Sequence, residues 1–445
     1  ALALGRGAVL AGLIGCSALV PLMPTNDLKA DLTLLSGLIL LLGLYLVWRG
    51  RAVLSRSPLD LPLLTFLLAA VLATVFSPRP FLSLFPSRSR GDGLLVYAVY
   101  VLTAWAAARL KPNDLRVVLK AVLASATIIG AVAVAQFYGS DPLHWVGLRA
   151  IAPGQFFGIL TPPTADLPLF GWRSFATLGN PIFLGGYALL ILPIVIALLL
   201  ATSGRQPVLA VLSVVLAVVY AALVVSASRV AFAGLALSWG ALLLLPPRVP
   251  CLWRRVVLTA VLLVVVTAVL TLAGPGDQLI GRVKGGVNAQ DASLRMKVFV
   301  WKHIIPLIAQ RPLFGWGFSN LAGRLPGIGS KEYFEIYGFA LSGIDTAHNE
   351  TLHIAFSTGV IGLAAYLWIW AVVLKSLLAS VRRDAGHRAA AAGMLAAMAG
   401  YFLWLQSAWS HIGPANVFWM LAGGSAALAR SAQGVSSSPR DSPKR

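Results

Sequence analysis

The chain has 445 residues, of which 58% are hydrophobic and only 11% are charged, and its mean hydropathy is +0.83. Soluble globular domains carry about a quarter charged residues, so this composition excludes a soluble protein and indicates an integral membrane protein with many spans. The formal net charge of +20 would suggest a nucleic-acid partner in a soluble chain. The two cysteines, Cys16 and Cys251, lie in or beside different apolar segments and predict no disulfide framework.

A transmembrane helix needs about 20 predominantly apolar residues, and windows of that length predict about twelve spans. They cover residues 8–24, 31–48, 58–77, 93–109, 115–138, 180–201, 207–226, 228–246, 253–273, 349–374, 389–411 and 415–430. The apolar run from Pro207 to Leu245 is too long for one helix, and the polar stretch Ser226–Arg229 interrupts it. This interruption predicts a tight turn at a membrane surface. Cys16 follows a stretch that resembles a lipoprotein cleavage site, but a first span is the favoured interpretation.

The placement of lysine and arginine sets the orientation. If the N-terminus is inside, most basic residues fall in short inner segments, which satisfies the positive-inside rule with both termini cytoplasmic. Most of the positive charge is then expected to contact anionic membrane lipids, and it does not indicate nucleic acid. Residues 1–430 are predicted to form one transmembrane domain. The segment 431–445, rich in Ser, Pro and Arg, is predicted to be a disordered cytoplasmic tail.

Polar sequence is concentrated in two long outer loops, at about residues 139–179 and 274–348, whereas every inner loop is short. A chain that keeps its non-membrane structure on one side is expected to work there. In the stretch Ser293–Gly317, apolar residues recur at helical spacing: Met296, Phe299, Val300, Ile304, Leu307 and Ile308. This pattern predicts an amphipathic helix that lies on the membrane and ends at Arg311–Pro312. The helix would anchor the loop, or aim Arg295 at a site on the membrane face.

The sequence HNETLH, which begins at His348, resembles the zinc motif H-E-x-x-H but does not fit it. His348 and His353 are separated by about 140° around a helix, so they cannot share a metal as histidines four residues apart do, and no metal site is expected. A lone histidine at the mouth of a span is either an interfacial residue or a catalytic one. Asp345, Asn349 and Glu350 are placed to orient its ring and fix one tautomer, which favours a general base.

Arginines lie beside several predicted spans on the outer face. Arg173 precedes the sixth span, Arg229 lies in the turn between the seventh and eighth, and Arg295 begins the loop helix. Singly, each is as well explained as a solvated or snorkelling charge. Together they predict a binding site for a lipid-linked diphosphate leaving group, because guanidinium groups bind phosphate oxygens bidentately and stay charged. Arg88 and Arg90, in a short outer loop, are further candidates or ordinary loop charges.

Four stretches together resemble the O-antigen ligase family, which also contains Wzy-type O-antigen polymerases and bacterial O-linked oligosaccharyltransferases. They are RSFATLGNPIFLGGY (Arg173–Tyr187), SASRVAFAGLAL (Ser226–Leu237), RPLFGWG (Arg311–Gly317) and AHNETLHIAFSTGVIGL (Ala347–Leu363). Each stretch is short, but their order and their placement around a long outer loop are specific. The resemblance spans about residues 80–425.

The resemblance implies an all-α, polytopic, GT-C-like membrane glycosyltransferase with about twelve spans and a long periplasmic loop between spans nine and ten. Such an enzyme takes a glycan from undecaprenyl diphosphate on the periplasmic face of the bacterial inner membrane and inverts the anomeric centre, with no metal or cofactor. The family's loop histidine corresponds to His348, as base for the acceptor hydroxyl. Its arginines correspond to Arg173 and Arg295, and Arg229 matches a Ser-x-Arg turn that is structural or contacts diphosphate.

Three functions remain open from the sequence. A ligase would move a whole polymer onto lipid A–core or another final acceptor, and the family's name favours this interpretation. A Wzy-type polymerase would use a second lipid-linked repeat as acceptor. A polysaccharide flippase would carry out no chemistry; transporters often show internal repeats and charges in mid-membrane, whereas here the notable charges lie at the outer surface and no convincing repeat is visible.

Overall fold

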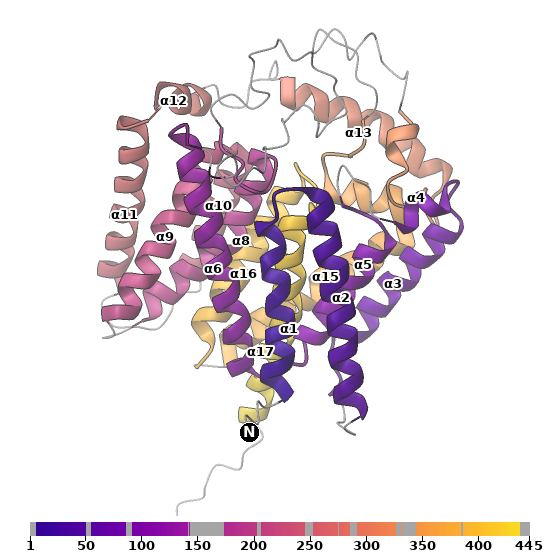
Figure 1. Cartoon of the computed structure of the whole chain (residues 1–445), viewed down its shortest axis with the longest axis horizontal. Coiled ribbons are helices and arrows are strands. Elements are labelled where there is room, and N and C mark those ends of the chain that lie inside the picture. The colour runs from indigo at the N-terminus through magenta and orange to yellow at the C-terminus, as the bar shows by residue number, and fades with distance from the viewer. Residues whose placement is uncertain are drawn as a thin grey trace, which may run out of the picture.

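The computed structural model of the chain consists of helices and connecting segments, with no strand among the residues that it describes (Figure 1). The described residues are 6–49, 55–85, 91–140, 142, 173–202, 206–244, 252–274, 276–284, 292–325, 331, 344–383 and 386–436. The prediction of an all-α protein is confirmed within these ranges.

Within the described ranges, eight helices are long and apolar enough to cross a membrane: α2 (Asn26–Arg49), α6 (Pro112–Phe137), α8 (Pro181–Ala201), α9 (Gln206–Ser226), α11 (Leu252–Leu272), α15 (Glu350–Arg383), α16 (Arg388–Leu405) and α17 (Ile412–Ser436). Shorter apolar helices are α1 (Arg6–Cys16) continued by η1 (Ser17–Leu22), α3 (Asp60–Val75), α5 (Leu94–Ala107) and α10 (Arg229–Leu244). Every predicted span overlaps one of these helices. The chain is therefore a multi-pass membrane protein; the count of about twelve spans stays a prediction. Helix α17 continues past Arg430, so the first residues of the predicted tail are helical.

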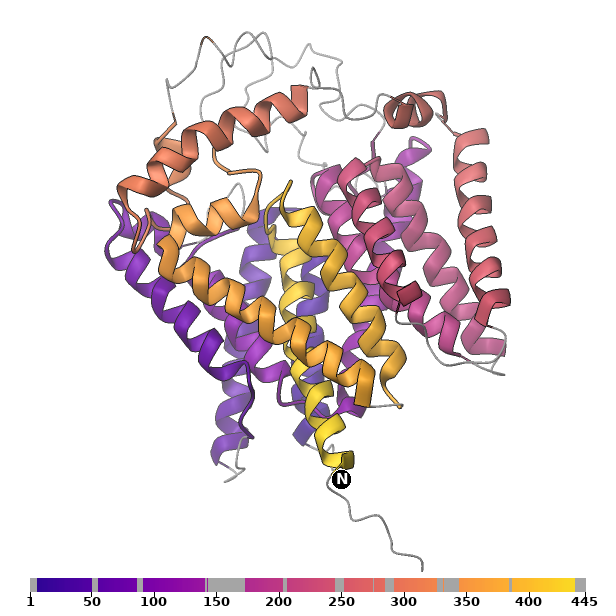
Figure 2. The same ribbon diagram turned by 180° about the vertical axis from the view of Figure 1, so that it is seen from behind.

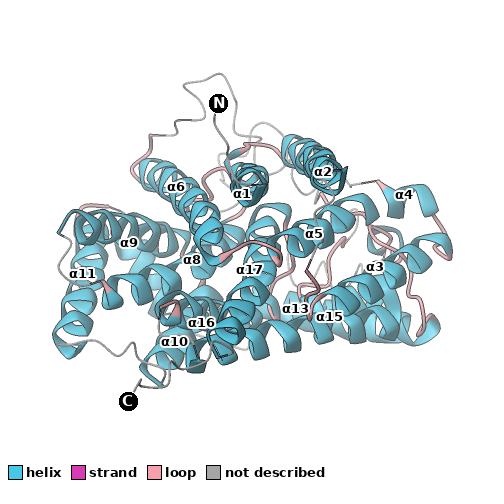
Figure 3. Ribbon diagram, turned by 90° about the horizontal axis from the view of Figure 1, so that it is seen from below, coloured by secondary structure: helices cyan, strands magenta, loops and turns pink. Residues whose placement is uncertain are grey.

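Helices α8 and α17 form the buried centre of the bundle. The apolar window of α8 is 83% buried and that of α17 is 94% buried, whereas the window of α11 is only 11% buried. Viewed from below, α17 lies among the other helices while α11 lies at one edge and α3 at the other (Figure 3). Helix α8 is apolar on every side, as expected for a helix that other helices surround.

Helices α10 and α16 approach closely because a glycine on each faces the other. A Cβ on Gly234 would lie 2.8 Å from the carbonyl oxygen of Gly400, and a Cβ on Gly400 would lie 2.5 Å from that of Gly234. The Ser238 hydroxyl donates across the same interface to the Ala396 carbonyl at 2.8 Å. Small residues and interhelical hydrogen bonds hold membrane helices together where no hydrophobic effect drives association.

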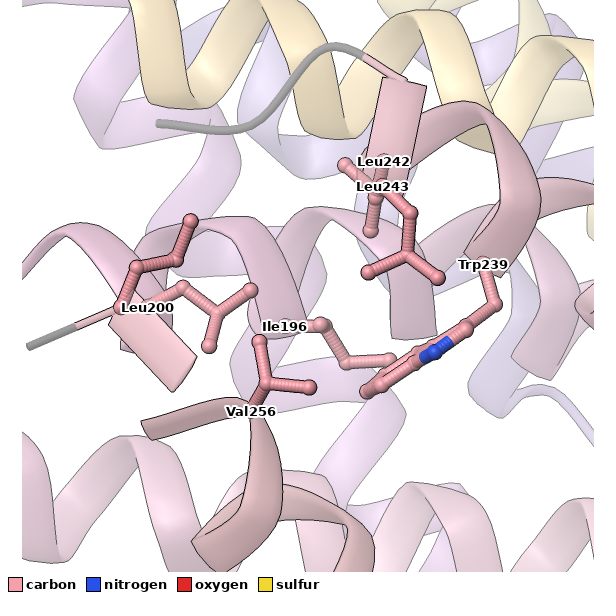
Figure 4. Close-up of a pocket in the computed structure, with 7 residues that line it drawn as sticks. Ile196, Leu200, Trp239, Leu242, Leu243 and Val256 are labelled. Carbon is pink, nitrogen blue, oxygen red and sulfur yellow. The ribbon is translucent and has the colours of Figure 1, made fainter. Parts of the chain in front are cut away.

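Tight packing also closes the ends of α8, α10 and α11 against one another. Apolar side chains from these three helices surround a cavity of about 10 Å³ (Figure 4). The labelled side chains are Ile196, Leu200, Trp239, Leu242, Leu243 and Val256. A space of this volume holds no more than one water molecule, so this contact is structural packing rather than a binding site.

The predicted turn between the seventh and eighth spans is confirmed. Helix α9 ends at Ser226 and α10 begins at Arg229. Ala227 adopts a left-handed backbone with φ 46°, and the Ser226 hydroxyl accepts a hydrogen bond from the Ser228 amide at 3.3 Å. The turn thus places the first residue of α10, the half-buried Arg229, at one end of the bundle.

Helices α12 (Gly276–Lys284) and α13 (Ala292–Gln310) lie across that end, with α4 (Pro80–Leu84) and η3 (Leu321–Gly323) (Figures 1 and 2). We call this the loop end. The opposite end, called the basic end, carries Arg109, Arg255, Arg382 and Arg430. As predicted, α13 stops just before Arg311–Pro312. Its apolar face, however, packs on the protein's own Trp316, Leu321, Leu325 and Phe356, whereas the sequence predicted contact with the membrane.

Helix α15 is broken at Gly359, and the segment 312–317 fills the break. Gly359 has φ 67° and ψ −171°, which is not helical. The amides of Trp316 and Gly317 donate to the carbonyls of Phe356 and Ser357 at 2.8 and 2.9 Å, and the Val360 amide donates to the Pro312 carbonyl at 2.7 Å. The RPLFGWG motif therefore supplies the hydrogen bonds that the broken helix loses. Figure 2 shows the two parts of α15 at an angle to each other.

Candidate functional site

His348 lies in the turn that leads into α15, at the loop end. Its backbone is left-handed, with φ 49°, and its side chain is partly exposed. The imidazole packs edge-to-face on the indole of Trp409, with ring centroids 4.8 Å apart and an interplanar angle of 89°. Trp409 is buried and belongs to the connection between α16 and α17. The ring of His348 is thus fixed by a residue far along the chain.

The residues that follow His348 hold this connection in place. The Asn349 side chain donates to the Gln406 carbonyl at 3.0 Å, and Thr351 donates to the Gln406 side chain at 3.0 Å. The Glu350 carboxylate is buried and accepts a hydrogen bond from the Ser410 amide at 2.7 Å. Asn349 and Glu350, predicted as supporting residues, therefore act on the segment that carries Trp409.

The same connection reaches the first turn of α8. Trp409 packs edge-to-face on Phe183 with centroids 5.0 Å apart, and Phe183 stacks on His411 at 3.9 Å. The His411 Nε2 lies 3.0 Å from the Asn26 side-chain oxygen. Burial, and next the neighbouring Lys29, lowers the pKa of His411 well below its usual range. This histidine is therefore a neutral packing residue that joins α2 and α8 to the connection.

Arg173 and the Ser226–Arg229 turn, predicted separately, lie together. The Arg173 guanidinium donates through Nε to the Ser226 carbonyl at 2.9 Å, and the Ser174 amide donates to the Val225 carbonyl at 3.1 Å. The next residues are fixed by Gln136, whose side-chain oxygen accepts from the Ala176 amide at 2.7 Å. The segment then enters α8, where Asn180 caps the helix by accepting a hydrogen bond from the Ile182 amide.

Arg229 stands at the head of an apolar groove between α9, α10, α11 and α12. The groove has a volume of about 660 Å³, and Val224, Phe232 and Leu279 are among the residues that line it. Besides Arg229, the polar side chains that line the groove include Tyr220 and Thr267, whose hydroxyls form a hydrogen bond with each other at 3.0 Å. An apolar groove with a cation at the loop end suits a lipid whose charged head lies beside that end.

Helix α13 places a cation over the His348 turn, and that cation is Lys297. The indole nitrogen of Trp301 donates to the Ala347 carbonyl at 3.0 Å, next to His348. One turn earlier on the same face, the Lys297 ammonium donates to the Ser407 hydroxyl. Arg295, which the sequence predicted as a diphosphate-binding residue, is exposed. It lies two residues before Lys297, which places the two side chains about 200° apart around the helix.

The remaining candidates of the sequence analysis lie apart from the His348 ring. Asp345 lies in the described segment before His348 and is partly exposed, whereas Arg88 and Arg90 lie outside the described residues. His353 is turned away from His348 and lies in the protein interior, with its Nε2 3.6 Å from the Asp92 carboxylate. Ser319 donates to the other Asp92 oxygen at 2.8 Å. Across the described part of the chain, no group of three or more His, Cys, Asp or Glu could hold a metal ion.

Sequence reasoning missed Lys297 and Trp409. Lys297 had a detectable signal, because it lies four residues before Trp301 and residues at that spacing share a helix face. Trp409 had none, because its contact with His348 joins two segments that only the folded bundle brings together.

The helices and the site define a membrane protein whose polar groups converge above the bundle at one end. Residues 212–367 match a family model described as O-Antigen ligase. This stretch of the chain is therefore similar to the O-antigen ligase family, as the sequence motifs indicated. The match contains three of the four motif stretches, and Arg173–Tyr187 lies before it. Comparison with curated proteins finds no match.

Proposed function

We propose that the protein is a glycosyltransferase of the O-antigen ligase type, which transfers a glycan from undecaprenyl diphosphate to an acceptor hydroxyl at the loop end. The observation that carries this proposal is the convergence of one histidine and several cations there. His348 is fixed by Trp409, Lys297 lies over the same connection, and the Arg173 segment joins the Ser226–Arg229 turn. The loop end then faces the periplasm, and both termini lie in the cytoplasm of a bacterium.

The proposed reaction is a single displacement. His348 takes the proton of the acceptor hydroxyl, and the hydroxyl oxygen forms a bond to the anomeric carbon. The bond from that carbon to the diphosphate oxygen breaks, and its electron pair leaves with undecaprenyl diphosphate. Attack opposite the leaving group inverts the anomeric centre. Arg173, Arg229 and Lys297 stabilise the diphosphate charge, as cations do for transferring phosphoryl groups.

The groove at Arg229 supports a lipid-linked donor. Its walls are apolar, as an isoprenoid chain requires, and its cation lies at the end where a diphosphate would be held. The preferred acceptor is lipid A–core. A second lipid-linked repeat, which would make the protein a Wzy-type polymerase, is the alternative, because the site geometry constrains the donor more than the acceptor.

In vitro transfer tests the proposal. Purified protein is mixed with undecaprenyl-diphosphate glycan, with or without rough lipopolysaccharide, in the presence and absence of EDTA. We expect product on lipopolysaccharide that is insensitive to EDTA. His348→Ala should lower the rate by about 10²- to 10⁴-fold, the usual contribution of a general base. His387→Ala, at the basic end, is the matched control and should keep the wild-type rate.

Other outcomes would change the assignment. Chain growth with donor alone would identify a polymerase. Equal transfer by wild type and His348→Ala would remove His348 from the chemistry. No transfer to either acceptor by a folded protein, together with movement of the lipid-linked glycan across vesicles, would instead identify a flippase.

A further inference from the structure

A second large groove lies on the opposite side of the bundle from Arg229, between α2 and α3. Both helices pack against α5, and together the three surround a volume of about 790 Å³. Its walls include the apolar side chains Leu38, Leu41, Leu64, Leu67, Leu95 and Leu102. Leu38 is 65% exposed and Leu64 is 62% exposed, so the groove opens toward the lipid.

Among the described residues that line the groove, the polar ones lie toward the basic end. Asp60 and Trp105 line it there. The Asp60 carboxylate forms an ion pair with Arg109 at 2.8 Å, and the Arg109 guanidinium lies 3.7 Å above the Trp105 ring. The other Asp60 oxygen accepts a hydrogen bond from the Ser57 amide at 2.8 Å. The carboxylate is thus engaged on both oxygens.

Arg430 adds a second guanidinium beside this ion pair. It donates to the Ser55 hydroxyl at 2.7 Å and to the Leu110 carbonyl at 3.3 Å, which are both neutral oxygens. Two arginines and one carboxylate leave a net positive charge at this end of the groove. An anionic group bound there would complete the charge balance, and arginine binds phosphate oxygens well.

We propose that this groove binds one phospholipid with an anionic head group from the leaflet at the basic end. The head group would lie beside Arg430, since the Arg109 side chain is only 7% exposed and is bonded to Asp60 and the Trp105 carbonyl. The acyl chains would run along the leucines toward mid-membrane. A lipid-linked sugar held for reaction at His348 does not fit this groove, because its head group would lie at the loop end. The site is therefore separate from the transfer reaction and does not depend on the proposed function.

Native mass spectrometry tests the proposal on the full chain in detergent, titrated with dioleoylphosphatidylglycerol or dioleoylphosphatidylcholine. We expect one tightly bound phosphatidylglycerol and weaker binding of phosphatidylcholine. Leu64→Trp fills the groove and should abolish the tight site. Leu68→Trp is the matched control, since Leu68 is also exposed on α3 but does not line the groove.

Arg430→Gln tests the head-group contact without filling the groove. It should lower phosphatidylglycerol affinity by about fivefold, which corresponds to one cation beside an anionic lipid, and leave phosphatidylcholine binding unchanged. Arg383→Gln, an exposed arginine on α15 at the same end, should change neither. Equal phosphatidylglycerol binding by wild type, Leu64→Trp and Arg430→Gln would overturn the proposal. So would lipid-free protein dimers that Leu64→Trp dissociates, because a second copy would then occupy the groove.

Discussion

His348 adopts a left-handed backbone because both of its neighbours are fixed by other elements. A non-glycine residue in this conformation stores strain and persists only where the surroundings hold it. The Ala347 carbonyl accepts a hydrogen bond from Trp301 of α13, and the Asn349 side chain donates to Gln406 beyond α16. The histidine thus lies between two residues that are held by hydrogen bonds, and its ring is oriented by the backbone as well as by Trp409.

Trp409→Ala should lower kcat and leave KM for both substrates nearly unchanged, because the indole orients the imidazole but lies buried behind it. An edge-to-face ring pair contributes about 0.5–1.5 kcal/mol beyond burial, so we expect a loss of up to roughly tenfold in kcat. Steady-state transfer kinetics measure it. Trp253→Ala, a change at an exposed tryptophan of α11, should have no effect. A rise in KM with constant kcat would instead place Trp409 in substrate binding.

Lys297→Met should weaken donor binding, whereas Arg295→Met should not. Lys297 points to Ser407 at the His348 connection, and Arg295 is exposed on another side of α13. Loss of one charge-assisted hydrogen bond costs about 1.5–3 kcal/mol, which corresponds to a rise in the donor KM of more than tenfold. Lys297→Arg should restore most of the affinity. If Arg295→Met were the more damaging change, the sequence-based assignment would be correct and the geometric one wrong.

Among the elements, α15 depends most on a partner for its shape. A helix broken at Gly359 leaves carbonyl groups of its preceding turn without their usual donors, and irregular backbone at membrane depth is tolerated only where protein covers it. The segment 312–317 covers it with backbone hydrogen bonds and with a further contact from the Ser77 hydroxyl to the Trp316 carbonyl at 3.0 Å. The end of α3, the RPLFGWG motif and α15 are therefore one structural unit.

Gly359→Ala should destabilise the protein severely. A Cβ there would lie 2.2 Å from the Leu313 carbonyl oxygen, and φ of 67° already strains any residue with a side chain. We expect a loss of more than about 2 kcal/mol, read as a lower midpoint of thermal aggregation in detergent. Gly240→Ala in α10 is the matched control, since nothing lies within 4 Å of its Cβ. There, alanine should be neutral or stabilising because it favours a helix.

The sequence predicted where helices lie far better than how they are interrupted. Hydropathy located α15 but treated residues 349–374 as one continuous span, because a window average does not register a single glycine such as Gly359. The periodicity of the sequence located the amphipathic helix α13, but the prediction assigned its apolar face to the membrane. Periodicity indicates that a face is buried and does not indicate whether lipid or protein covers it. His348 was predicted as the base from its position at a span, which stays a prediction, whereas the contact of Trp409 depends on long-range packing that periodicity does not encode.

At the scale of the whole molecule, the two ends of the bundle differ in the residues that they carry and in the role that we expect of them. The loop end gathers His348 and Lys297 at the α16–α17 connection and the Arg173 segment at the Ser226–Arg229 turn, and its contacts join α2, α8 and α15. The basic end holds arginines beside the groove between α2 and α3. Chemistry is expected at one end and anchoring in lipid at the other, so substitutions at the basic end should change stability and lipid binding before they change transfer.

Stability should fall as the pH falls below about 6.5, the ordinary pKa of histidine, because His411 links α2 and α8 as a neutral group. Its pKa is depressed in the folded protein, so between that depressed value and 6.5 the unfolded state binds more protons. Each pH unit in this window costs about 1.4 kcal/mol. Thermal midpoints at pH 7.5 and 5.5 measure the loss, and His411→Asn should reduce it. The same loss in His411→Asn as in wild type would assign it to other groups.

The broken helix also bears on the order in which the chain is made. The Phe356 and Ser357 carbonyls accept hydrogen bonds from Trp316 and Gly317. Without these donors, a broken α15 would leave both carbonyls unbonded, at a cost of several kcal/mol each in lipid. Their donors, Trp316 and Gly317, are synthesised earlier. In the proposed orientation the loop end is exported, so we expect these donors to be in place before α15 is inserted and to serve as a template for it. In the Gly359→Ala protein the new methyl group would keep residues 312–317 from pairing with α15. We expect membrane proteases to degrade this protein soon after synthesis, which pulse-chase labelling would detect. A lifetime equal to that of the wild type would contradict this view.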